Sequence, residues 1–482
     1  MANENKLQAI IAHAKEYGFV FPSSEIYDGL GAVYDYGQWG VELKRNVRDY
    51  WWRWMTQMNE QNIVGIDAAI FMHPTTWKAS GHVDNFSDPM IDNKDSKKRY
   101  RVDHLIEGFA ETLPKDQGDA LLADMDRLIA GDDFAGLKTL IENNKIKCAV
   151  SGTCNWTDVR QFNLMFSTEV GSVADESNTI YLRPETAQGI FVNFLNVQKS
   201  GRMKIPFGIA QVGKAFRNEI VARGFIFRMR EFEQMEMQFF VRPGTQQQWY
   251  EYWKEKRMAW HMTLGIPAER YRFHDHVKLA HYADAACDIE YDFPMGFKEL
   301  EGIHSRTDFD LQSHQEYSKK KMQYFDADLD ENGKAYGNYI PYVIETSIGL
   351  DRTLLMLMSE AYEEQDLSTA EKQDSRVVMK FIPKLAPIKL AVLPLTKKDG
   401  LPEIASELMQ ECKQHFKCFY EEKDTIGKRY RRMDAIGTPF CVTIDHQTKE
   451  DQTVTIRYRD SMEQERVPMS AVRNIVQQAI NE

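Results

Sequence analysis

The sequence predicts an α+β core built on an antiparallel sheet flanked by helices, followed by a smaller C-terminal α/β domain. Two strand-like runs, 208–219 and 228–240, are separated by a short polar loop and can pair as a hairpin. Residues 387–482 instead alternate strand-like and helical segments, which is typical of an α/β domain. The chain has 482 residues, which is enough for two or three domains with a large core.

Composition narrows the class of protein. With 43% hydrophobic and 27% charged residues, it has the make-up of an ordinary soluble globular protein. No apolar run approaches the roughly 20 residues that span a membrane, and the first residues lack the shape of a secretion signal. Six scattered cysteines do not indicate a disulfide framework. We therefore expect a cytoplasmic protein without a membrane partner. Its net charge of −12 argues against broad, nonspecific nucleic-acid binding.

Four regions follow one another along the chain. In the first, 1–89, a helix is predicted from about Gly40, because apolar residues recur at helical spacing through "GVELKRNVRDYWW". The second, 90–150, is polar and predicted to be a helical insertion that caps the core. The third, 151–383, alternates strand-like runs with charged motifs and forms the core proper. The fourth, 387–482, is the α/β domain.

The predicted hairpin carries many fixed charges of both signs. In its second strand, Phe232 stands in the same alternating row as arginine, glutamine and glutamate side chains. One interpretation is a solvated outer face held together by ion pairs. The other is a pocket for a polyanion with a flat ring, because arginine binds phosphate oxygens in two-pronged fashion and an aromatic face stacks on a base. The first interpretation does not explain Phe232.

Two more segments carry carboxylates of the same character. In "RPETAQGIFVNF", Glu185 lies near a predicted helix start, where it either complements the helix dipole or meets a ligand. In "KELEGIHSRTDFDLQSH", Glu299 and Glu301 share a face if the segment is extended. Such a pair beside a triphosphate suits Mg²⁺, which takes a few carboxylate oxygens together with phosphate and water. The alternative is an exposed acidic strand.

A third segment, "YVIETSIGLDRTLLMLM", joins a strand to a helix. Glu345 and Ser347 fall on one strand face, and Gly349 permits a close turn. Arg352 lies in the first turn of the helix, where the dipole disfavours a cation. A cation in this position indicates an anionic or aromatic partner. The alternative is an arginine on the solvent side of the helix.

Together these segments resemble a known family. "FRNE…RMREF" resembles motif 2 of the class II aminoacyl-tRNA synthetases, "GLDR" resembles motif 3, and "GVELKRNVRDYWW" lies where motif 1 falls. The words "RPETAQGIF", "REFEQME", "ETSIGLDR" and "SSEIY…GAVYDYG" are similar to those of the dimeric glycyl-tRNA synthetases. The resemblance covers nearly the whole chain. It implies a class II synthetase-like core with motif 1 in 1–89 and motifs 2 and 3 in 151–383, and an anticodon-binding domain in 387–482.

The resemblance also implies roles for individual residues. Arg217 would hold the α-phosphate of ATP, Glu219 the adenine, and Arg228 the β- and γ-phosphates, while Phe232 and Arg352 would sandwich the adenine. The whole implied ATP site is Arg217, Asn218, Glu219, Arg228, Phe232, Glu299, Leu300, Gly349 and Arg352, with Glu299 also toward Mg²⁺. The implied glycine site is Arg101, Glu185, Glu236, Glu345 and Ser347.

The implied reaction joins glycine to tRNA(Gly) through a glycyl-adenylate, by a homodimer. The basic cluster in "IGKRYRRMDAIG" offers Lys428, Arg429 and Arg432 for tRNA contact. Two alternatives stay open: a synthetase-like ligase with an acceptor other than tRNA, and a non-catalytic, synthetase-like nucleic-acid-binding subunit. The C-terminal domain argues against the first. The second predicts the loss of motif residues that are present here.

One segment departs from the family pattern. "KCAVSGTC" holds Cys148 and Cys154 where many bacterial relatives have a C-P-x-C-G word, and Ser151 replaces the second cysteine of that word. A four-ligand zinc site needs two further partners, and none stands at a familiar spacing. The sequence therefore does not favour zinc.

Overall fold

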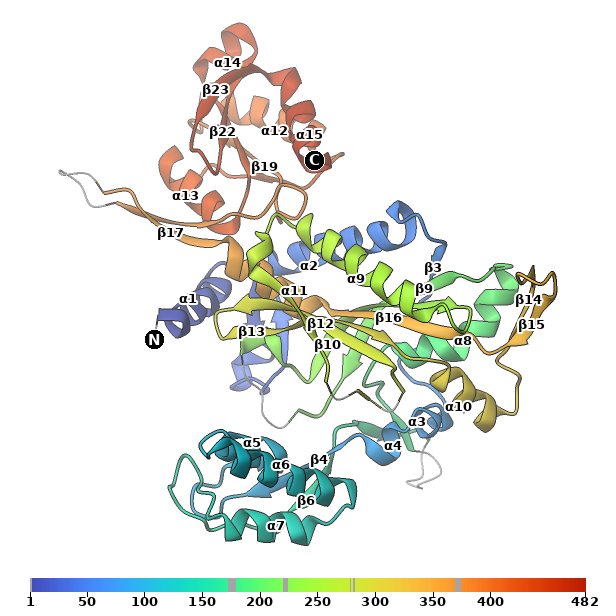
Figure 1. Cartoon of the computed structure of the whole chain (residues 1–482). Helices are drawn as coiled ribbons and strands as arrows, with labels where there is room; N and C mark the ends of the chain where they lie inside the picture. Colours follow the sequence, from blue (N-terminus) through green and yellow to red (C-terminus); the bar gives the residue numbers. More distant parts are fainter. Residues whose placement is uncertain (1, 172–178, 220–223, 278, 281, 369–373) are drawn as a thin grey trace.

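A seven-stranded sheet forms the centre of the core in this computed structural model, which describes residues 2–171, 179–219, 224–277, 279–280, 282–368 and 374–482. The strand order is β11-β12-β13-β16-β10-β9-β3 (Figure 1). β3 runs parallel to β9, and the other neighbours are antiparallel, as predicted for the core. The strands are β3 (Ile63–Gly65), β9 (Phe207–Phe216), β10 (Glu231–Val241), β11 (Tyr271–Asp275), β12 (Ala285–Phe293), β13 (Gly296–Ser305) and β16 (Tyr342–Gly349).

Three helices cover one face of this sheet: α2 (Gly40–Arg53), α9 (Gln246–Met262) and α11 (Leu350–Ala361) (Figure 1). The helix predicted from Gly40 is confirmed, and it buries Leu43, Val47 and Trp51 against the sheet. Val41 of the same helix is 49% exposed, so the apolar stripe does not include it. In β10 and β12 every second residue enters this core, which fixes the hydrophobic side of the sheet.

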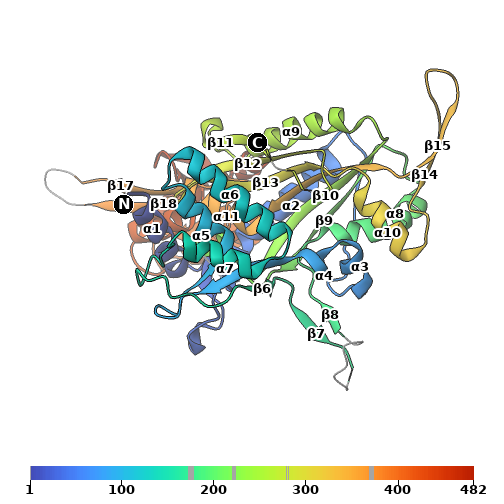
Figure 2. The same ribbon diagram turned by 60° about the horizontal axis from the view of Figure 1, so that its bottom comes forward.

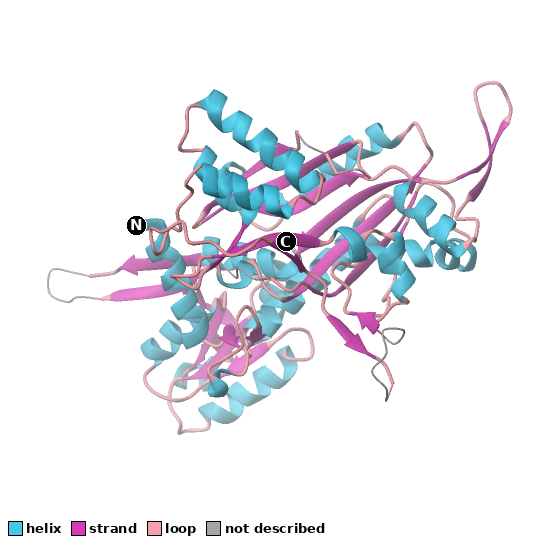
Figure 3. Ribbon diagram, turned by 90° about the horizontal axis from the view of Figure 1, so that it is seen from below, coloured by secondary structure: helices cyan, strands magenta, loops and turns pink. Residues whose placement is uncertain are grey.

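The opposite face of the sheet is apolar only at one end. There, α8 (Ala187–Ser200) and α10 (Phe309–Ser318) bury Phe191, Phe194 and Leu311 with Phe240 of β10. Figure 3 shows the helices and strands of the molecule from below the view of Figure 1. Further along β10 this face carries polar residues instead, and two short helices, α3 (Pro74–Ala79) and α4 (His82–Asn85), lie near it (Figure 1). The functional side chains described below project from this polar stretch.

The predicted hairpin forms, but its strands are shorter than the predicted ranges at the turn. β9 ends at Phe216 and β10 begins at Glu231, so Arg217 and Arg228 lie outside the ladder. A 3₁₀ turn, η4 (Phe225–Phe227), occupies part of the connection. The backbone amide of Arg217 still donates to the carbonyl of Arg230 at 2.9 Å, which holds the two strand ends together.

The insertion forms a separate unit at one end of the core (Figure 1). Its helices have their own hydrophobic core, and the chain enters and leaves through β4 and β6, where Ser87 pairs with Asn163. We predicted helices over 90–150; the unit also contains a three-stranded sheet and extends to β6. Its elements are β4 (Ser87–Asp92), β5 (Arg99–Arg101), α5 (Val102–Ala110), α6 (Lys115–Ala130), α7 (Phe134–Asn143) and β6 (Arg160–Asn163).

The C-terminal α/β unit lies at the other end of the core (Figure 1). Its five-stranded sheet has the order β20-β19-β21-β22-β23 and its own hydrophobic core. The first three strands of this order are parallel and the rest antiparallel. The elements are β19 (Leu390–Pro394), α12 (Leu401–Cys412), β20 (Cys418–Tyr420), α13 (Ile426–Ile436), β21 (Phe440–Ile444), α14 (His446–Asp451), β22 (Thr453–Tyr458), β23 (Gln464–Pro468), η6 (Met469–Ala471) and α15 (Val472–Asn481).

Three hairpins extend from the body of the molecule (Figure 2). They pair β7 (Ser167–Glu169) with β8 (Thr179–Tyr181), β14 (Tyr324–Leu329) with β15 (Ala335–Tyr339), and β17 (Tyr362–Asp366) with β18 (Ser375–Met379). The remaining elements are α1 (Ala2–Glu16), β1 (Val20–Pro22), η1 (Glu25–Tyr27), β2 (Tyr34–Tyr36), η2 (Trp54–Met58) and η5 (Ala268–Arg270). Among the described residues, no helix has both the length and the apolar character to cross a membrane.

Candidate active site

A cavity of about 100 Å³ opens on the polar face of the sheet, between the turn of the hairpin and the start of α11. Seven of the nine predicted ATP-site residues line this cavity. The exceptions are Leu300, whose side chain is buried in the hydrophobic core, and Asn218, whose backbone amide donates to the carbonyl of Leu164 at 2.8 Å. The seven are Arg217, Glu219, Arg228, Phe232, Glu299, Gly349 and Arg352.

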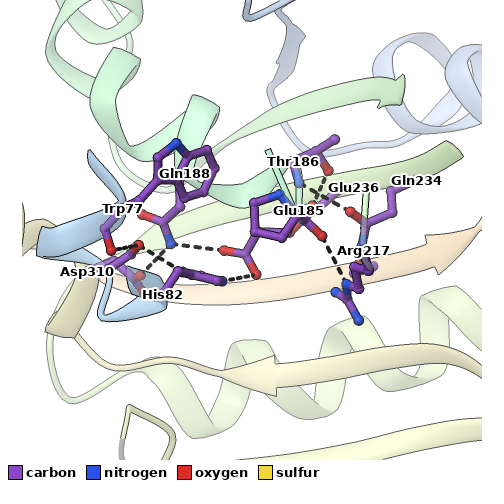
Figure 4. A network of polar contacts seen from close by, with 12 residues as sticks. Trp77, His82, Glu185, Thr186, Gln188, Arg217, Gln234, Glu236 and Asp310 are labelled. Atoms are coloured by element: carbon purple, nitrogen blue, oxygen red, sulfur yellow. Dashed lines mark hydrogen bonds and ion pairs between the residues drawn. The ribbon is translucent and has the colours of Figure 1, made fainter. Parts of the chain in front are cut away.

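Arg217 is held between two aromatic rings. Its guanidinium lies 5.4 Å from the ring centre of Phe232 and 5.5 Å from that of Phe86, which stands just before the insertion. Its Nε donates to the carbonyl of Pro184 at 3.0 Å (Figure 4). Among the described residues, no hydrogen bond uses its two terminal nitrogens, so both remain free to bind an anion.

Arg352 has both kinds of partner that the sequence indicated. Its guanidinium lies 4.5 Å from the ring centre of Phe227, and Nη1 lies 3.1 Å from a carboxylate oxygen of Glu299. The charge of Arg352 lowers the pKa of the Glu299 carboxyl, and burial acts to raise it. The arginine has the larger effect, so the pKa is lowered. The unfavourable position at the helix start is thus offset by an anion and an aromatic ring.

Glu299 and Glu301 do not share a face, contrary to the prediction. Glu290 of β12 pairs with Glu299 and Ile289 pairs with Glu301, so Leu300 is an extra residue in β13. Such a bulge shifts the alternation of side chains. Glu301 is consequently buried on the helix-covered side, where Arg257 and His261 of α9 bind it, and Glu299 alone faces the cavity. The prediction that Glu299 and Glu301 together bind Mg²⁺ is therefore wrong.

A second cluster continues the polar face past the cavity, where carboxylates gather. Register places Glu236 opposite Ser347 and Gln238 opposite Glu345. The amide of Gln238 donates to Glu236 at 2.9 Å and to Glu345 at 2.7 Å, and the hydroxyl of Thr186 donates to Glu236 (Figure 4). Four of the five predicted glycine-site residues therefore lie in one region, because Glu185 precedes Thr186 directly.

Several residues of this cluster were not predicted. Arg306 donates to Glu345 at 2.9 Å and to both oxygens of Asp310, and His304 contacts Glu345. Gln188 bridges Glu185 and Asp310 with hydrogen bonds of 3.0 Å each, and His82 faces Glu185 (Figure 4). Three of them, His304, Arg306 and Asp310, lie in "GIHSRTDFD", whose density of polar and charged residues was a usable signal. Only the two glutamates that precede this run were singled out from the sequence. His82 stands in the unremarkable run "KASGHVDNF" and gave no such signal.

The electrostatics of the cluster separate its carboxylates into two protonation states. Burial, and then the charges of Glu345 and Glu185, raise the pKa of Glu236 well above its usual range. Burial also acts to raise the pKa of Glu345, but Arg306 and His304 outweigh it and lower that pKa. Burial is likewise opposed at Glu185, where His82 and Arg306 bring the pKa down to about 2. These shifts favour a protonated Glu236 beside ionised Glu345 and Glu185, and a cation bound among the three would favour loss of that proton.

Arg101 does not join this cluster. It forms ion pairs with Asp88 at 3.2 Å and Asp103 at 2.5 Å, at the start of the insertion. There it lines a larger cavity of about 1380 Å³ between the insertion and the core, which it shares with Glu219 and Arg228 of the first cavity. Two carboxylates already neutralise its charge, so the prediction of a glycine contact for Arg101 is not supported by its position.

The three predicted tRNA-contact residues on α13 do not all face the solvent. Arg429 is 2% exposed and donates to the carbonyls of Pro394, Leu395 and Glu421, so it ties the domain together and does not face an external partner. The prediction for Arg429 is wrong because its helical position turns it inward. Lys428 is exposed, and Arg432 forms ion pairs with Asp424 and Glu421 at the surface.

The two cysteines of "KCAVSGTC", Cys148 and Cys154, lie in different environments. Cys148 is buried, and its sulfur lies 3.2 Å from the hydroxyl of Ser96 and 3.1 Å from that of Tyr100. Burial acts to raise the pKa of this thiol, but hydrogen bonds from Ser151, Ser96 and Tyr100 lower it to about 6. Cys154 is exposed. Within the described part of the chain, no three His, Cys, Asp or Glu residues are grouped to hold a metal ion.

Comparison with known families gives consecutive matches along the chain. Residues 88–117 and 113–164 match the glycyl-tRNA synthetase insertion domain 1, residues 166–361 the class II tRNA synthetase core domain (G, H, P, S and T), and residues 389–479 the anticodon binding domain. Relatives named glycine–tRNA ligase match nearly end to end. That of Chlorobaculum tepidum is 54% identical over 96% of this chain and 98% of its own length. Those of Treponema denticola and Macrococcus caseolyticus are each 52% identical, over 96% and 99% of this chain and 94% and 99% of their own lengths.

Proposed function

This chain belongs to the glycine–tRNA ligase family of class II aminoacyl-tRNA synthetases, and we propose that it forms glycyl-adenylate on the polar face of its seven-stranded sheet. It is an enzyme that ligates glycine to tRNA. The observation that carries the site proposal is that a cavity lined by arginines and Phe232 adjoins a cluster of carboxylates on one sheet face.

ATP binds in the first cavity. The free terminal nitrogens of Arg217 hold the α-phosphate, Arg228 reaches the β- and γ-phosphates, and the adenine lies between Phe232 and Arg352. Glu219 stands at the adenine end. The stacking of Arg217 between Phe86 and Phe232 supports its role, because it fixes the guanidinium before the nucleotide arrives.

Glycine binds in the second cluster, with its ammonium group among Glu185, Glu236, Glu345 and Ser347. A carboxylate oxygen of glycine then attacks the α-phosphorus of ATP, so that a new P–O bond forms and pyrophosphate leaves. In the second step, a terminal ribose hydroxyl of tRNA attacks the carbonyl carbon, loses its proton, and AMP leaves. No protein nucleophile is needed, since the enzyme supplies alignment and fixed charge.

Aminoacyl-tRNA synthetases generally use ATP and Mg²⁺, and the donors in the ATP site fit this ion in part. Glu299 offers one carboxylate at the cavity, with the phosphates of ATP and water left to supply the remaining oxygens. When bound, Mg²⁺ neutralises charge on the phosphates. Glu299 also pairs with Arg352, so it orients this arginine toward the nucleotide whether or not the ion is present.

Selection of glycine follows from the crowding of the second cluster. Gln238, Arg306 and Thr186 occupy the space around Glu236 and Glu345 with hydrogen bonds. A substrate side chain would have to displace these groups or leave them unpaired, and a filled site excludes an added methyl group more strongly than an open one.

The parts outside the catalytic face have their own proposed partners. The C-terminal unit binds tRNA(Gly) at its anticodon, with Lys428 and Arg432 on the exposed side of α13. Motif 1, in α2, lies at the interface of a cytoplasmic homodimer. Four large apolar side chains are exposed in the single chain, which supports this interface: Val41 on α2, and Ile26, Tyr27 and Leu30 in and after η1.

The test is exchange of labelled pyrophosphate into ATP, one amino acid at a time and without tRNA. Glycine alone should support exchange. Arg217→Ala should lower kcat/KM for exchange about 10²–10³-fold, as expected when one preorganised donor to a developing charge is lost. Exchange with a different amino acid would refute the glycine site. No exchange with any amino acid, in folded protein, would refute the adenylation site.

A further inference from the structure

We infer that two histidines, His304 and His82, are positioning residues that hold the carboxylates of Glu345 and Glu185 in place around the ammonium group of glycine. The inference rests on the proposed function, because it takes both carboxylates as the ammonium's partners. Neither histidine belongs to the set of residues that the sequence motifs singled out.

His304 is fixed on the floor of the cluster. It stands opposite Glu345 in the pairing of β13 with β16, and its Nδ1 donates to Oε1 of Glu345 at 2.8 Å. Its ring lies over Gly302, where an added Cβ would come within 2.9 Å of the ring's Cε1. Any side chain at position 302 would thus push the imidazole away from Glu345, so Gly302 provides the space that this contact requires.

His82 is fixed from three sides at the wall of the cluster, and Figure 4 shows its ring next to Glu185. Its Nδ1 lies 2.8 Å from the hydroxyl of Ser80, and its ring centre lies 5.6 Å from that of Trp77 and 5.2 Å from that of Phe86. These contacts aim the other nitrogen, Nε2, at Oε2 of Glu185, 3.4 Å away. The ring therefore has one orientation in which both nitrogens are used.

Each histidine binds the carboxylate oxygen that other partners leave open. At Glu345, Gln238 and Arg306 both donate to Oε2, and His304 takes Oε1. At Glu185, the amide of Gln188 donates to Oε1, and His82 takes Oε2. Among the described residues, no other N–H group contacts Oε1 of Glu345 or Oε2 of Glu185. Without the histidine, either carboxylate could rotate about its last bond, and its free oxygen would lose its fixed direction toward the ligand.

The two histidines use opposite ring nitrogens, which permits a matched test with amide substitutions. The amide nitrogen of asparagine stands at the distance of Nδ1 from the backbone, and that of glutamine at the distance of Nε2. His304→Asn and His82→Gln should therefore keep the KM for glycine within about twofold of wild type. His304→Gln and His82→Asn should raise it about tenfold, as expected for one oriented hydrogen bond to a charged group, with the KM for ATP unchanged. The assay is glycine-dependent pyrophosphate exchange.

The control is His446→Asn, because His446 pairs with Asp399 on the exposed surface of the C-terminal unit. This variant should match wild type in both constants. The inference is overturned if both substitutions at a position leave the KM for glycine unchanged, or if both raise the KM for glycine and for ATP alike, as a general structural loss would. In either case the proposed function stands, because wild type still exchanges with glycine. If wild type itself shows no glycine-dependent exchange, it is the proposed function that fails.

Discussion

Replacing Glu301 should destabilise the core strongly, because the carboxylate neutralises a cation that has no access to water. Glu301, Arg257 and His261 all have side chains that are 0% exposed. Arg257 donates to Glu301 through Nε at 2.5 Å and Nη2 at 3.2 Å, and Nε2 of His261 lies 2.8 Å from the same carboxylate. Among the described residues, Nη1 of Arg257 has no hydrogen-bond partner, so no other group there can take over the charge.

The size of the effect follows from these contacts. Breaking a buried ion pair by removing one partner costs about 3–5 kcal/mol, and Glu301→Gln keeps the shape of the side chain while removing its charge. In urea unfolding, followed by tryptophan fluorescence, the midpoint for the core should fall by about 1 M or more. Trp54 and Trp260 lie 5.1 and 4.6 Å from the Arg257 guanidinium, so they report directly on this region.

Two comparisons decide whether the reasoning holds. The double variant Arg257→Met, Glu301→Met should be more stable than Glu301→Met alone, because it removes both buried charges. Glu60→Gln, at a surface pair with Lys256, should leave the midpoint unchanged. A loss below about 1 kcal/mol for Glu301→Gln, or a double variant that is no better than the single one, would refute the argument that charge compensation in a dry site matters here.

Three further outcomes can be tested. The pKa of Glu236 is raised in the folded state, so wild type loses stability as pH rises above the usual carboxylate range. Because Glu236→Gln cannot ionise, scanning calorimetry should find that it melts at a higher temperature than wild type at about pH 8 and at the same temperature at about pH 5. The same variant should bind glycine more weakly. Arg429→Met should lower the melting temperature of the C-terminal unit, whereas Lys428→Ala should leave it unchanged and raise the KM for tRNA; the opposite pattern would contradict the assignment of Arg429 to the domain interior. Elemental analysis should find no stoichiometric zinc in purified wild type or in Cys148→Ala, because hydroxyl groups and not further metal ligands contact the Cys148 sulfur. One zinc per chain in wild type would contradict this interpretation of the Cys148 site.

The sequence was most informative where function places an unusual residue in a regular element. Phe232 in a polar row and Arg352 at a helix start both violate local preferences, and both line the first cavity. The carboxylates Glu236 and Glu345, in contrast, were assigned to the glycine site through the resemblance to a known family and not through such a local signal. Local rules fail most visibly where a site has to be built, and these failures can be read from one sequence.

What could not be predicted depends on contacts between distant segments or on the loss of strand regularity. The bulge at Leu300 leaves no mark in the alternation, so Glu301 was placed on the wrong face. Arg429 looks basic and exposed in sequence, but its direction is set by the carbonyls around it, which come from other segments. His82 reaches Glu185 across about a hundred residues, and only the fold brings them together.

The attachment of the insertion has a consequence for how the protein can be altered. Ser87 and Asn163 face each other as neighbours in one ladder, so the intervening segment begins and ends at nearly the same point in space. Its helices and strands bury their own apolar residues. A tight turn that joins these two positions would close the remaining chain without stretching its backbone. The position of its two ends therefore allows the insertion to change in length with little geometric penalty to the seven-stranded sheet, while its inner surface also lines the larger cavity with Glu219 and Arg228.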